Sequence, residues 1–419
     1  MTMKKKYSSA KDLAPYFESV YGRVKNTDEV YNFFDSSLEE ALLPKKQILA
    51  AMRPLFVKDV SYGFSYDIPN GHLGLRETVA ERYLGNRNLA KDVIITAGAQ
   101  EALYLALNYL ARKKKRLTVA IEEFIYLGFR QIIEEFNCKL VEIPLQKNGL
   151  NTDFLEEELR NRNIDLLYTI PDLQNPTGVT LSKKKRVQIK RLQQKYNFNI
   201  IVDLAYRDLY YNDIYKMPLA SLIGPNNFIV GTFSKTIFPS LRIGWLYAPQ
   251  NSQSISLMKR SINLFQPSFL QVSVDEFLKK DYDNYLSVIK YVFIEKKKYL
   301  QFLLEYYGLN KYFTWNDPKG SYYLWLKVKP PAQIKISKFM SKNVIVAPGT
   351  FFNPLRGKDY IRLCYSKLTC IQLWQAVSII SSIYGEDKRS IWSVRLLLRT
   401  VWTLVNIRAT ILTQRFFSR

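Results

Sequence analysis

The sequence predicts an α/β protein with a large domain, built on a mainly parallel central sheet, and a smaller α/β domain. Short apolar runs alternate with amphipathic segments from about residue 93 to residue 250, which is the pattern of strands covered by helices. Polar side chains stand where several of these runs end, as expected when a ligand binds at the carboxyl edge of such a sheet. The length of 419 residues is sufficient for both domains.

The expected domain organisation follows the chain in order. Residues 1–60 should form an N-terminal arm and part of the small domain, and residues 61–285 the large domain. Residues 286–385 should complete the small domain, and residues 386–419 form a basic amphipathic C-terminal extension. The segment from 255 to 309 is predicted to be helical and long enough to bridge the two domains.

The segment 232–245 contains the most informative chemistry. It follows a strand-like run at 228–232 and places Lys235 directly after Ser234 and seven residues before Arg242. Such a lysine could form a Schiff base with an aldehyde cofactor, whose phosphate the serine and the arginine could hold. In a chain this rich in lysine, a single lysine is more often a solvated surface charge, so the interpretation depends on other motifs.

Two more polar residues follow predicted strands. Asn175 lies in a Leu-Gln-Asn-Pro-Thr-Gly turn after the apolar run 165–170, where it is either simple turn chemistry or a rigid amide that donates to a phenolic oxygen. Asp203 ends a strongly apolar strand, where it is either a helix N-cap or the partner of a cation such as a protonated pyridine nitrogen. Tyr206 lies three residues later and could reach the same ring.

Together these motifs resemble those of the fold-type I enzymes that depend on pyridoxal 5'-phosphate (PLP), specifically the class I and II aminotransferase superfamily. The resemblance covers roughly residues 60 to 385. It is strongest to the branch that contains 2-aminoadipate and broad-specificity aminotransferases and the aminotransferase-like half of certain bacterial transcription regulators. Further segments match in order, at 66–76, 95–103, 317–325, 347–352 and 360–366.

This sequence departs from the family pattern at four positions. Serine replaces a usual glycine at Ser240 and Ser321, Phe124 replaces a proline, and Leu204 replaces a frequent acidic residue. None of these changes removes a catalytic group, so they affect the expected substrate and not the expected cofactor.

The resemblance implies a role for each candidate at the PLP ring. Lys235 would carry the cofactor as a Schiff base and, once released, move a proton between the substrate α-carbon and the cofactor. Asp203 would keep the pyridine nitrogen protonated. Asn175 and Tyr206 would hydrogen-bond the phenolic oxygen, and Tyr126 would stack on the ring face.

The resemblance also implies a phosphate site and a substrate site. Exposed amides before a helix expected near Glu101 would bind the phosphate together with Ser234 and Arg242. Arg362 would clamp the substrate α-carboxylate beside Asn175, with a surface strand arginine as the alternative interpretation. The amides of Gly98, Ala99 and Gln100 would bind the phosphate. Tyr66 would reach the site from a second subunit.

The function that this resemblance implies is a PLP-dependent aminotransferase, which transfers the amino group of an L-amino acid to a 2-oxo acid as a homodimer. Another fold-type I activity with the same residues, an amino-acid decarboxylase or a carbon–sulfur lyase, is the alternative enzyme. A PLP-binding regulator is the alternative from another class. Regulators of this superfamily carry an N-terminal winged helix-turn-helix, whereas the roughly sixty residues before Tyr62 include several acidic residues and also fit an arm and a small-domain helix. The identity of the substrate stays open.

Composition restricts the partners. The formal net charge of +24 indicates either a lysine-rich compositional bias or attraction to an anionic surface, and the absence of a basic-aromatic module argues against specific nucleic-acid binding. His72 is the single histidine, and Cys138, Cys364 and Cys370 lack metal-type spacing, so no metal is expected. Free thiols and the absence of a signal peptide lead us to expect a cytoplasmic protein.

The C-terminal extension at 386–419 has a wide apolar face when drawn as one helix. We expect this face to pack on the protein or on a sister subunit, with a membrane interface as an alternative. Three arginines within residues 395–413 argue against a spanning helix. A non-native extension from a recombined or frameshifted gene end is a third interpretation.

Overall fold

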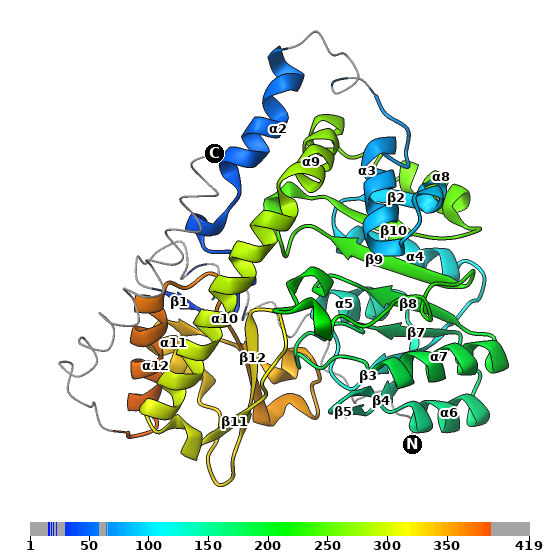
Figure 1. Ribbon diagram of the computed structural model, residues 1–419. Helices are drawn as coiled ribbons and strands as arrows, with labels where there is room; N and C mark the ends of the chain where they lie inside the picture. Colours follow the sequence, from blue (N-terminus) through cyan, green and yellow to red (C-terminus); the bar gives the residue numbers. More distant parts are fainter. Residues whose placement is uncertain are drawn as a thin grey trace.

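Strands that alternate with helices along the chain build a large central sheet. The computed structural model describes residues 30–57 and 66–386, together with residues 16, 18, 20, 22 and 64. Within this part of the chain, seven strands pair in the order β2-β10-β9-β8-β7-β3-β4 (Figure 1). Their bounds are Val93–Thr96 (β2), Thr118–Glu122 (β3), Lys139–Ile143 (β4), Leu166–Thr169 (β7), Asn199–Asp203 (β8), Asn227–Thr232 (β9) and Gly244–Tyr247 (β10).

The sheet is mainly parallel, as predicted. Strand β10 runs antiparallel to both of its neighbours, β2 and β9, whereas β9, β8, β7, β3 and β4 pair in parallel. The strands predicted at 165–170, 198–203 and 228–232 correspond to β7, β8 and β9. Parallel strands present all their carboxyl ends at one edge, and the polar residues singled out in the sequence follow these ends.

Helices cover both faces of the sheet because successive strand residues point in opposite directions. In β8, Ile201 packs in the cluster under α4, α5 and α8, whereas Ile200 and Val202 pack in the cluster with α3, α6 and α7. The face that Ile201 enters is covered by α4 (Ala99–Ala111), α5 (Leu127–Glu135) and α8 (Ser252–Arg260). The opposite face is covered by α3 (Leu73–Val79), α6 (Thr152–Asn161) and α7 (Lys183–Tyr196).

A smaller antiparallel sheet lies beside the large one. Its order is β11-β12-β15-β14, and α11 and α12 lie on its outer side (Figure 1). A strand from the N-terminal part of the chain, β1 (Tyr31–Asn32), pairs in parallel with β13 (Val344–Ile345), so residues far apart in sequence meet here. The strands of this sheet are Phe313–Trp315 (β11), Tyr323–Val328 (β12), Ala347–Pro348 (β14) and Tyr360–Cys364 (β15), and its helices are Ile336–Ser341 (α11) and Cys370–Ile383 (α12). A separate hairpin pairs Leu145–Gln146 (β5) with Gly149–Leu150 (β6).

Three helices occupy the segment predicted to bridge the domains. After α8, α9 (Ser268–Lys280) packs against α2 (Lys45–Val57), and α10 (Tyr282–Tyr306) then runs from α9 to α12 (Figure 1). The domain boundary expected at residue 285 falls inside α10, so this helix belongs to both parts.

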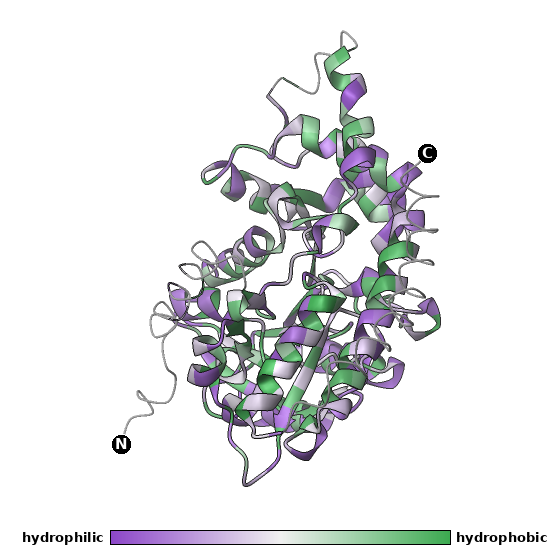
Figure 2. Ribbon diagram, turned by 90° about the vertical axis from the view of Figure 1, so that its left-hand side faces the viewer, coloured by the Kyte–Doolittle hydropathy of each residue, from purple (hydrophilic) through white to green (hydrophobic). Residues whose placement is uncertain are grey.

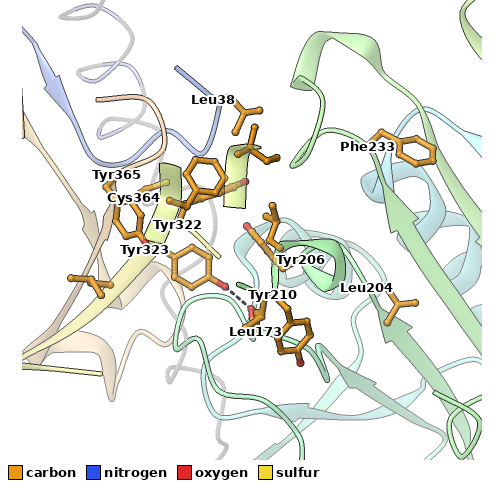
Figure 3. Packing of buried hydrophobic residues seen from close by; sticks show 14 of the residues in the cluster. Leu38, Leu173, Leu204, Tyr206, Tyr210, Phe233, Tyr322, Tyr323, Cys364 and Tyr365 are labelled. Carbon is orange, nitrogen blue, oxygen red and sulfur yellow. Dashed lines mark hydrogen bonds between the residues drawn. The ribbon is translucent and has the colours of Figure 1, made fainter. Parts of the chain in front are cut away.

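Aromatic side chains join the two sheets. Figure 3 shows Tyr323 of β12 directed at the loop after β7, where its hydroxyl donates a 2.6 Å hydrogen bond to the carbonyl of Leu173. Ser321, one of the serines that replaces a usual glycine, adopts a φ of +69°, a conformation that favours glycine. Its amide donates to the Leu209 carbonyl at 3.0 Å. These contacts fix the small sheet against the loops at the edge of the large one.

Parts of the chain lie outside the described residues. Apart from Glu386, the extension predicted at 386–419 lies outside the described residues, and so does the N-terminal segment before residue 30 except for residues 16, 18, 20 and 22. None of the helices that the structure describes has the length and apolar character that a bilayer crossing requires. The described cysteines are free thiols, and no group of three potential metal ligands occurs in the described ranges.

Candidate active site

A cavity of about 580 Å³ lies where the carboxyl edge of the large sheet meets the small sheet. The described residues that line it come from both sheets and from the N-terminal segment before α2. Seven residues that were predicted from separate motifs meet there: Gln100, Tyr126, Asn175, Tyr206, Lys235, Arg242 and Arg362.

Lys235 lies three residues after β9, in the loop that leads to β10. Its Nζ donates a hydrogen bond to the hydroxyl of Ser36 at 2.8 Å. Burial and, to a smaller extent, the Arg362 guanidinium lower the pKa of the Lys235 amine. A lysine with a lowered pKa has more of the neutral amine at neutral pH, and this form is both a nucleophile and a base.

Asp203 is the last residue of β8 and is 2% exposed. Its carboxylate accepts hydrogen bonds from the Tyr168 hydroxyl and from the Ala205 amide, both at 2.9 Å. Burial raises the pKa of the carboxyl, while these two hydrogen bonds act in the opposite direction. The bond to Ala205 is a local turn bond, and the N-cap interpretation is wrong, because the next helical turn, Arg207–Leu209, has Tyr206 at its N-cap. The Asp203 side chain does not belong to the lining of the cavity.

Asn175, Tyr206 and Arg362 form one hydrogen-bonded chain. Arg362 Nη1 donates to the Asn175 amide oxygen at 2.8 Å, and the Asn175 amide nitrogen donates to the Tyr206 hydroxyl at 3.3 Å. Arg362 Nη2 also donates to the Phe34 carbonyl at 3.0 Å. Because Arg362 is 6% exposed, the interpretation as a surface strand arginine is wrong, and its Nε has no hydrogen-bond partner among the described residues.

The start of α4 differs from the prediction. The helix begins at Ala99 and not near Glu101, because Gly98 adopts a φ of +82° and turns the chain into the helix two residues earlier. A Cβ atom on Gly98 would lie 3.2 Å from Arg242 Nη2. The glycine therefore leaves room for a guanidinium beside the first amides of the helix.

Several predicted residues lie near the cavity without lining it. Gly98, Ala99 and Ser234 are not among the lining residues, although the Ser234 hydroxyl accepts a hydrogen bond from Thr232 at 3.0 Å. Tyr66 is 86% exposed and packs edge-on against Phe265 at 5.6 Å. Tyr66 is expected to reach the site of a second subunit, which a single chain does not test, so this role stays a prediction.

Sequence reasoning missed the N-terminal wall of the cavity. Phe34, Asp35 and Ser36 line it, together with Lys367, whose Nζ binds the Asp35 carboxylate at 2.9 Å. The local signal was a run of turn-forming residues, Asp-Ser-Ser, after two phenylalanines. Such a run does not indicate which distant lysine it will contact.

Comparisons with known proteins agree with this architecture. The family model for aminotransferase class I and II matches residues 36–380. An uncharacterized HTH-type transcriptional regulator of Bacillus subtilis is 28% identical over 80% of this chain and 72% of its own length. Aromatic-amino-acid aminotransferase 1 of Thermococcus litoralis is 27% identical over 79% of this chain and 81% of its own.

Solved structures share the fold. The α-aminoadipate aminotransferase of Thermus thermophilus, in complex with N-(5'-phosphopyridoxyl)-L-leucine, superposes with a TM-score of 0.78 at 24% identity and covers 89% of this chain and 98% of its own. The predictions of the fold class and of an amino-group transferase are thereby confirmed. The chain belongs to the aminotransferase class I and II family.

Proposed function

We propose that the cavity binds PLP and that this chain uses it to transfer the amino group of an L-amino acid to a 2-oxo acid. The observation that carries this proposal is the convergence of Lys235, Asn175, Tyr206 and Arg362 on one cavity, from elements between residues 175 and 362. Residues with a nucleophilic amine, an amide, a phenol and a guanidinium meet at a single place, as the chemistry requires.

The described side chains fit PLP. The buried Asp203 carboxylate has a raised pKa, and a protonated pyridine nitrogen would be a suitable cationic partner for it. At the other end, the α4 N-terminus, opened by the positive φ of Gly98 and flanked by Arg242, suits a phosphate. Asn175 and Tyr206 would hold the phenolic oxygen between these ends, and Tyr126 would lie along the ring.

In the proposed reaction, Lys235 and Arg362 have different roles. When bound, PLP supplies an electron sink for the bond that breaks at the substrate α-carbon. Lys235 accepts the α-proton as a neutral amine and returns it as an ammonium. Arg362 binds the substrate α-carboxylate through donors that its bonds to Asn175 and Phe34 leave free, and those bonds hold the guanidinium in place beforehand.

The cavity wall suits a large apolar or aromatic substrate side chain. Phe34 and Phe351 pack edge to face with ring centroids 6.0 Å apart, and the Arg362 guanidinium lies 5.2 Å from the centre of the Phe352 ring. The additional cation at the cavity, Lys367, is already paired with Asp35 among the described residues. A dicarboxylic side chain would therefore need to break that ion pair, whereas an aromatic one would not. The name of the Thermococcus relative agrees with this preference.

A homodimer would cover an apolar surface around α2. Val57 and Phe56 on this helix are 74% and 60% exposed, and apolar positions recur along the helix at the top of the molecule in Figure 2. Such a contiguous apolar surface is typical of a protein interface, and a second copy would bring Tyr66 toward the neighbouring cavity. On the same helix, Leu49 is 65% exposed. Phe64 packs edge-on against Phe56 with ring centroids 5.1 Å apart.

Light scattering tests the dimer. Val57→Asp should convert the dimer to a monomer, because a carboxylate at a buried interface position is strongly unfavourable. Ile371→Asp changes an apolar residue of α12 that is 48% exposed, against 74% for Val57, and should leave the dimer intact. A monomeric wild-type protein at micromolar concentration would contradict this assembly.

An absorption spectrum with added PLP tests the function itself. The wild-type protein should show a cofactor band that an L-amino acid shifts and a 2-oxo acid restores, and Lys235→Ala should lose the band of the lysine-bound cofactor. Lys184→Ala, which changes an exposed lysine of α7, should behave as the wild type. A protein that binds no PLP would contradict the proposal, and release of carbon dioxide or of a thiol would indicate the alternative enzymes.

A further inference from the structure

The Ser36 hydroxyl contacts the amine at the centre of the proposed chemistry. We propose that Ser36 is a positioning residue for Lys235, whose hydroxyl oxygen holds the amine while it exchanges a proton with the substrate α-carbon. The two atoms, Lys235 Nζ and Ser36 Oγ, lie 2.8 Å apart. The inference rests on the proposed function, since it assigns a role within that reaction.

The backbone around Ser36 is held on several sides. The Asn32 side chain accepts hydrogen bonds from the amides of Phe34 and Asp35, at 2.9 and 3.0 Å. The Tyr322 hydroxyl donates to the Ser36 carbonyl at 3.1 Å. On the other side, the Ser366 hydroxyl donates to the carbonyl of the next residue at 2.6 Å. These bonds come from both the local turn and the small sheet, so they hold the backbone that carries the Ser36 hydroxyl beside Lys235.

The neighbouring carboxylate, that of Asp35, is paired with groups other than Lys235. The Asp35 carboxylate accepts hydrogen bonds from the Ser37 amide and hydroxyl, at 2.9 and 2.8 Å, and it pairs with Lys367. A carboxylate in direct contact with Lys235 would hold it as an ammonium, which cannot act as a base. A serine hydroxyl orients the amine without fixing its charge.

The contact suits both protonation states of the amine. A neutral amine that donates one N–H to Ser36 keeps its lone pair and directs it away from that bond, toward the cavity. When the amine takes the α-proton, it becomes an ammonium with one N–H still bound to the same oxygen. The proton moves from carbon to nitrogen and back, Ser36 gains and loses none, and no other reactant is needed.

Three variants separate this role from the packing of the segment. Ser36→Ala removes the acceptor, and Ser36→Thr keeps a hydroxyl. Ser37→Ala is the matched control, because it removes a hydroxyl from the next residue, which binds Asp35 and not Lys235. All three are compared with the wild-type full-length protein, and circular dichroism establishes that each variant is folded.

The first readout needs no turnover. In the protein freed of PLP, the acetylation of Lys235 by acetic anhydride is measured as a function of pH by peptide mass spectrometry. We expect Ser36→Ala to shift the profile of this lysine to lower pH, because an oxygen acceptor stabilises the ammonium more than the amine. Ser36→Thr and Ser37→Ala should keep the wild-type profile.

The second readout is transamination by the PLP-loaded protein with α-protiated and α-deuterated amino acid. Ser36→Ala should lower kcat about tenfold, with KM within about twofold, because positioned proton transfer contributes about 10²- to 10⁴-fold to such reactions. The deuterium isotope effect on kcat should increase, since proton transfer becomes slower relative to the other steps. Ser36→Thr should restore most of the rate.

The outcomes are distinguishable. If Ser36→Ala leaves either the labelling profile or kcat at the wild-type value, or if Ser37→Ala changes both equally, Ser36 has no positioning role while the proposed function stands. If the wild-type protein neither binds PLP nor transfers an amino group, both proposals fail together.

Discussion

Arg362 and Asn175 join the two sheets of this protein at the cavity. The arginine comes from β15 of the small sheet, and its Nη1 donates to the amide oxygen of Asn175, in the loop after β7, at 2.8 Å. This bond leaves the amide nitrogen of Asn175 directed at Tyr206. The guanidinium that we propose binds the substrate and the amide that we propose binds the cofactor therefore depend on each other for their orientation.

Replacement of Arg362 by lysine should impair the enzyme although it keeps the charge. Lysine cannot contact Asn175, the Phe34 carbonyl and a carboxylate at once. We expect Arg362→Lys to lower kcat/KM for the amino acid about 100-fold in steady-state assays, which corresponds to about 2.7 kcal/mol. Arg356→Lys, at a more exposed arginine paired with Glu123, should change kcat/KM less than twofold. A loss at both positions alike would contradict the assigned role.

Asp203→Asn should weaken both cofactor binding and catalysis. The amide cannot stabilise a protonated ring nitrogen as a carboxylate does, so we expect kcat to fall at least 100-fold and PLP affinity, measured by absorbance titration, to decrease. Tyr168→Phe removes one hydrogen bond to the same carboxylate and should have a smaller effect in the same direction. A larger effect for the tyrosine variant would show that the network, and not the charge, dominates.

Asp172 lies at the centre of a buried cluster of ion pairs, which the variant Asp172→Asn tests. Its carboxylate binds Arg186 at 2.5 Å and Arg207 at 2.6 Å, and although burial raises the pKa of Asp172, the two arginines lower it to a net depressed value. Asp172→Asn leaves both guanidinium groups without their counter-ion, so the free energy of unfolding should fall by about 3–5 kcal/mol in urea titrations. Asp213→Asn, at a carboxylate that is itself 72% exposed and pairs with Lys290, should cost less than about 1 kcal/mol.

The Asp172 effect should also depend on pH. A carboxyl with a depressed folded-state pKa stabilises the fold above its unfolded-state pKa, about 4, and loses that contribution as the pH falls through the folded value. The difference between Asp172→Asn and the wild type should therefore be largest above pH 4 and shrink in more acidic solution. A difference that grows on acidification would contradict the ion-pair explanation.

Glu122 should give the opposite dependence. Burial at the end of β3 raises the pKa of Glu122 to about 8, with the Thr169 hydroxyl donating to it at 2.6 Å. The folded state then binds a proton that the unfolded state has released, so stability should fall as the pH rises from about 4.5 to about 8, by up to about 1.4 kcal/mol per pH unit. Glu122→Gln should flatten this slope in urea titrations across that range. An unchanged slope would mean that Glu122 is ionised in the folded protein.

The Asp35–Lys367 pair should influence the choice of substrate. Asp35→Asn releases the lysine from its partner at 2.9 Å, and a free cation at the cavity would attract a side-chain carboxylate. We expect the ratio of kcat/KM for glutamate to that for phenylalanine to rise about tenfold, the effect of roughly one charge-assisted hydrogen bond. Equal changes for both substrates would contradict a role in selection.

Local motifs predicted the residues that follow strands of the large sheet. Asn175, Asp203 and Lys235 each follow an apolar run, and parallel strands bring their ends together whatever the distance between them in sequence. Ser36 and Asp35 could not be found in this way, because their position depends on the pairing of Tyr31 with Val344. A two-residue strand has too few residues to show a period, and nothing in it identifies its partner.

The start of α4 and the position of Phe124 show a second limit. The helix begins at Ala99, directly after Gly98 with its positive φ, and a Cβ on Gly98 would lie 3.2 Å from Arg242 Nη2. Phe124, which replaces a usual proline, packs edge-on against Trp325 of the small sheet at 5.2 Å. Both features arise from contacts across the fold, and no window of neighbouring residues contains them.

The bond between Arg362 and the Phe34 carbonyl spans 328 positions of the chain. A contact of such separation costs more loop-closure entropy than a contact between neighbours in the chain. We therefore expect a nascent chain to form the locally connected strands of its large sheet before it completes the cavity. Because PLP would bind the finished cavity and not the earlier states, its concentration would shift the balance toward the fully assembled protein. The concentration of PLP would then influence the fraction of this protein that is folded.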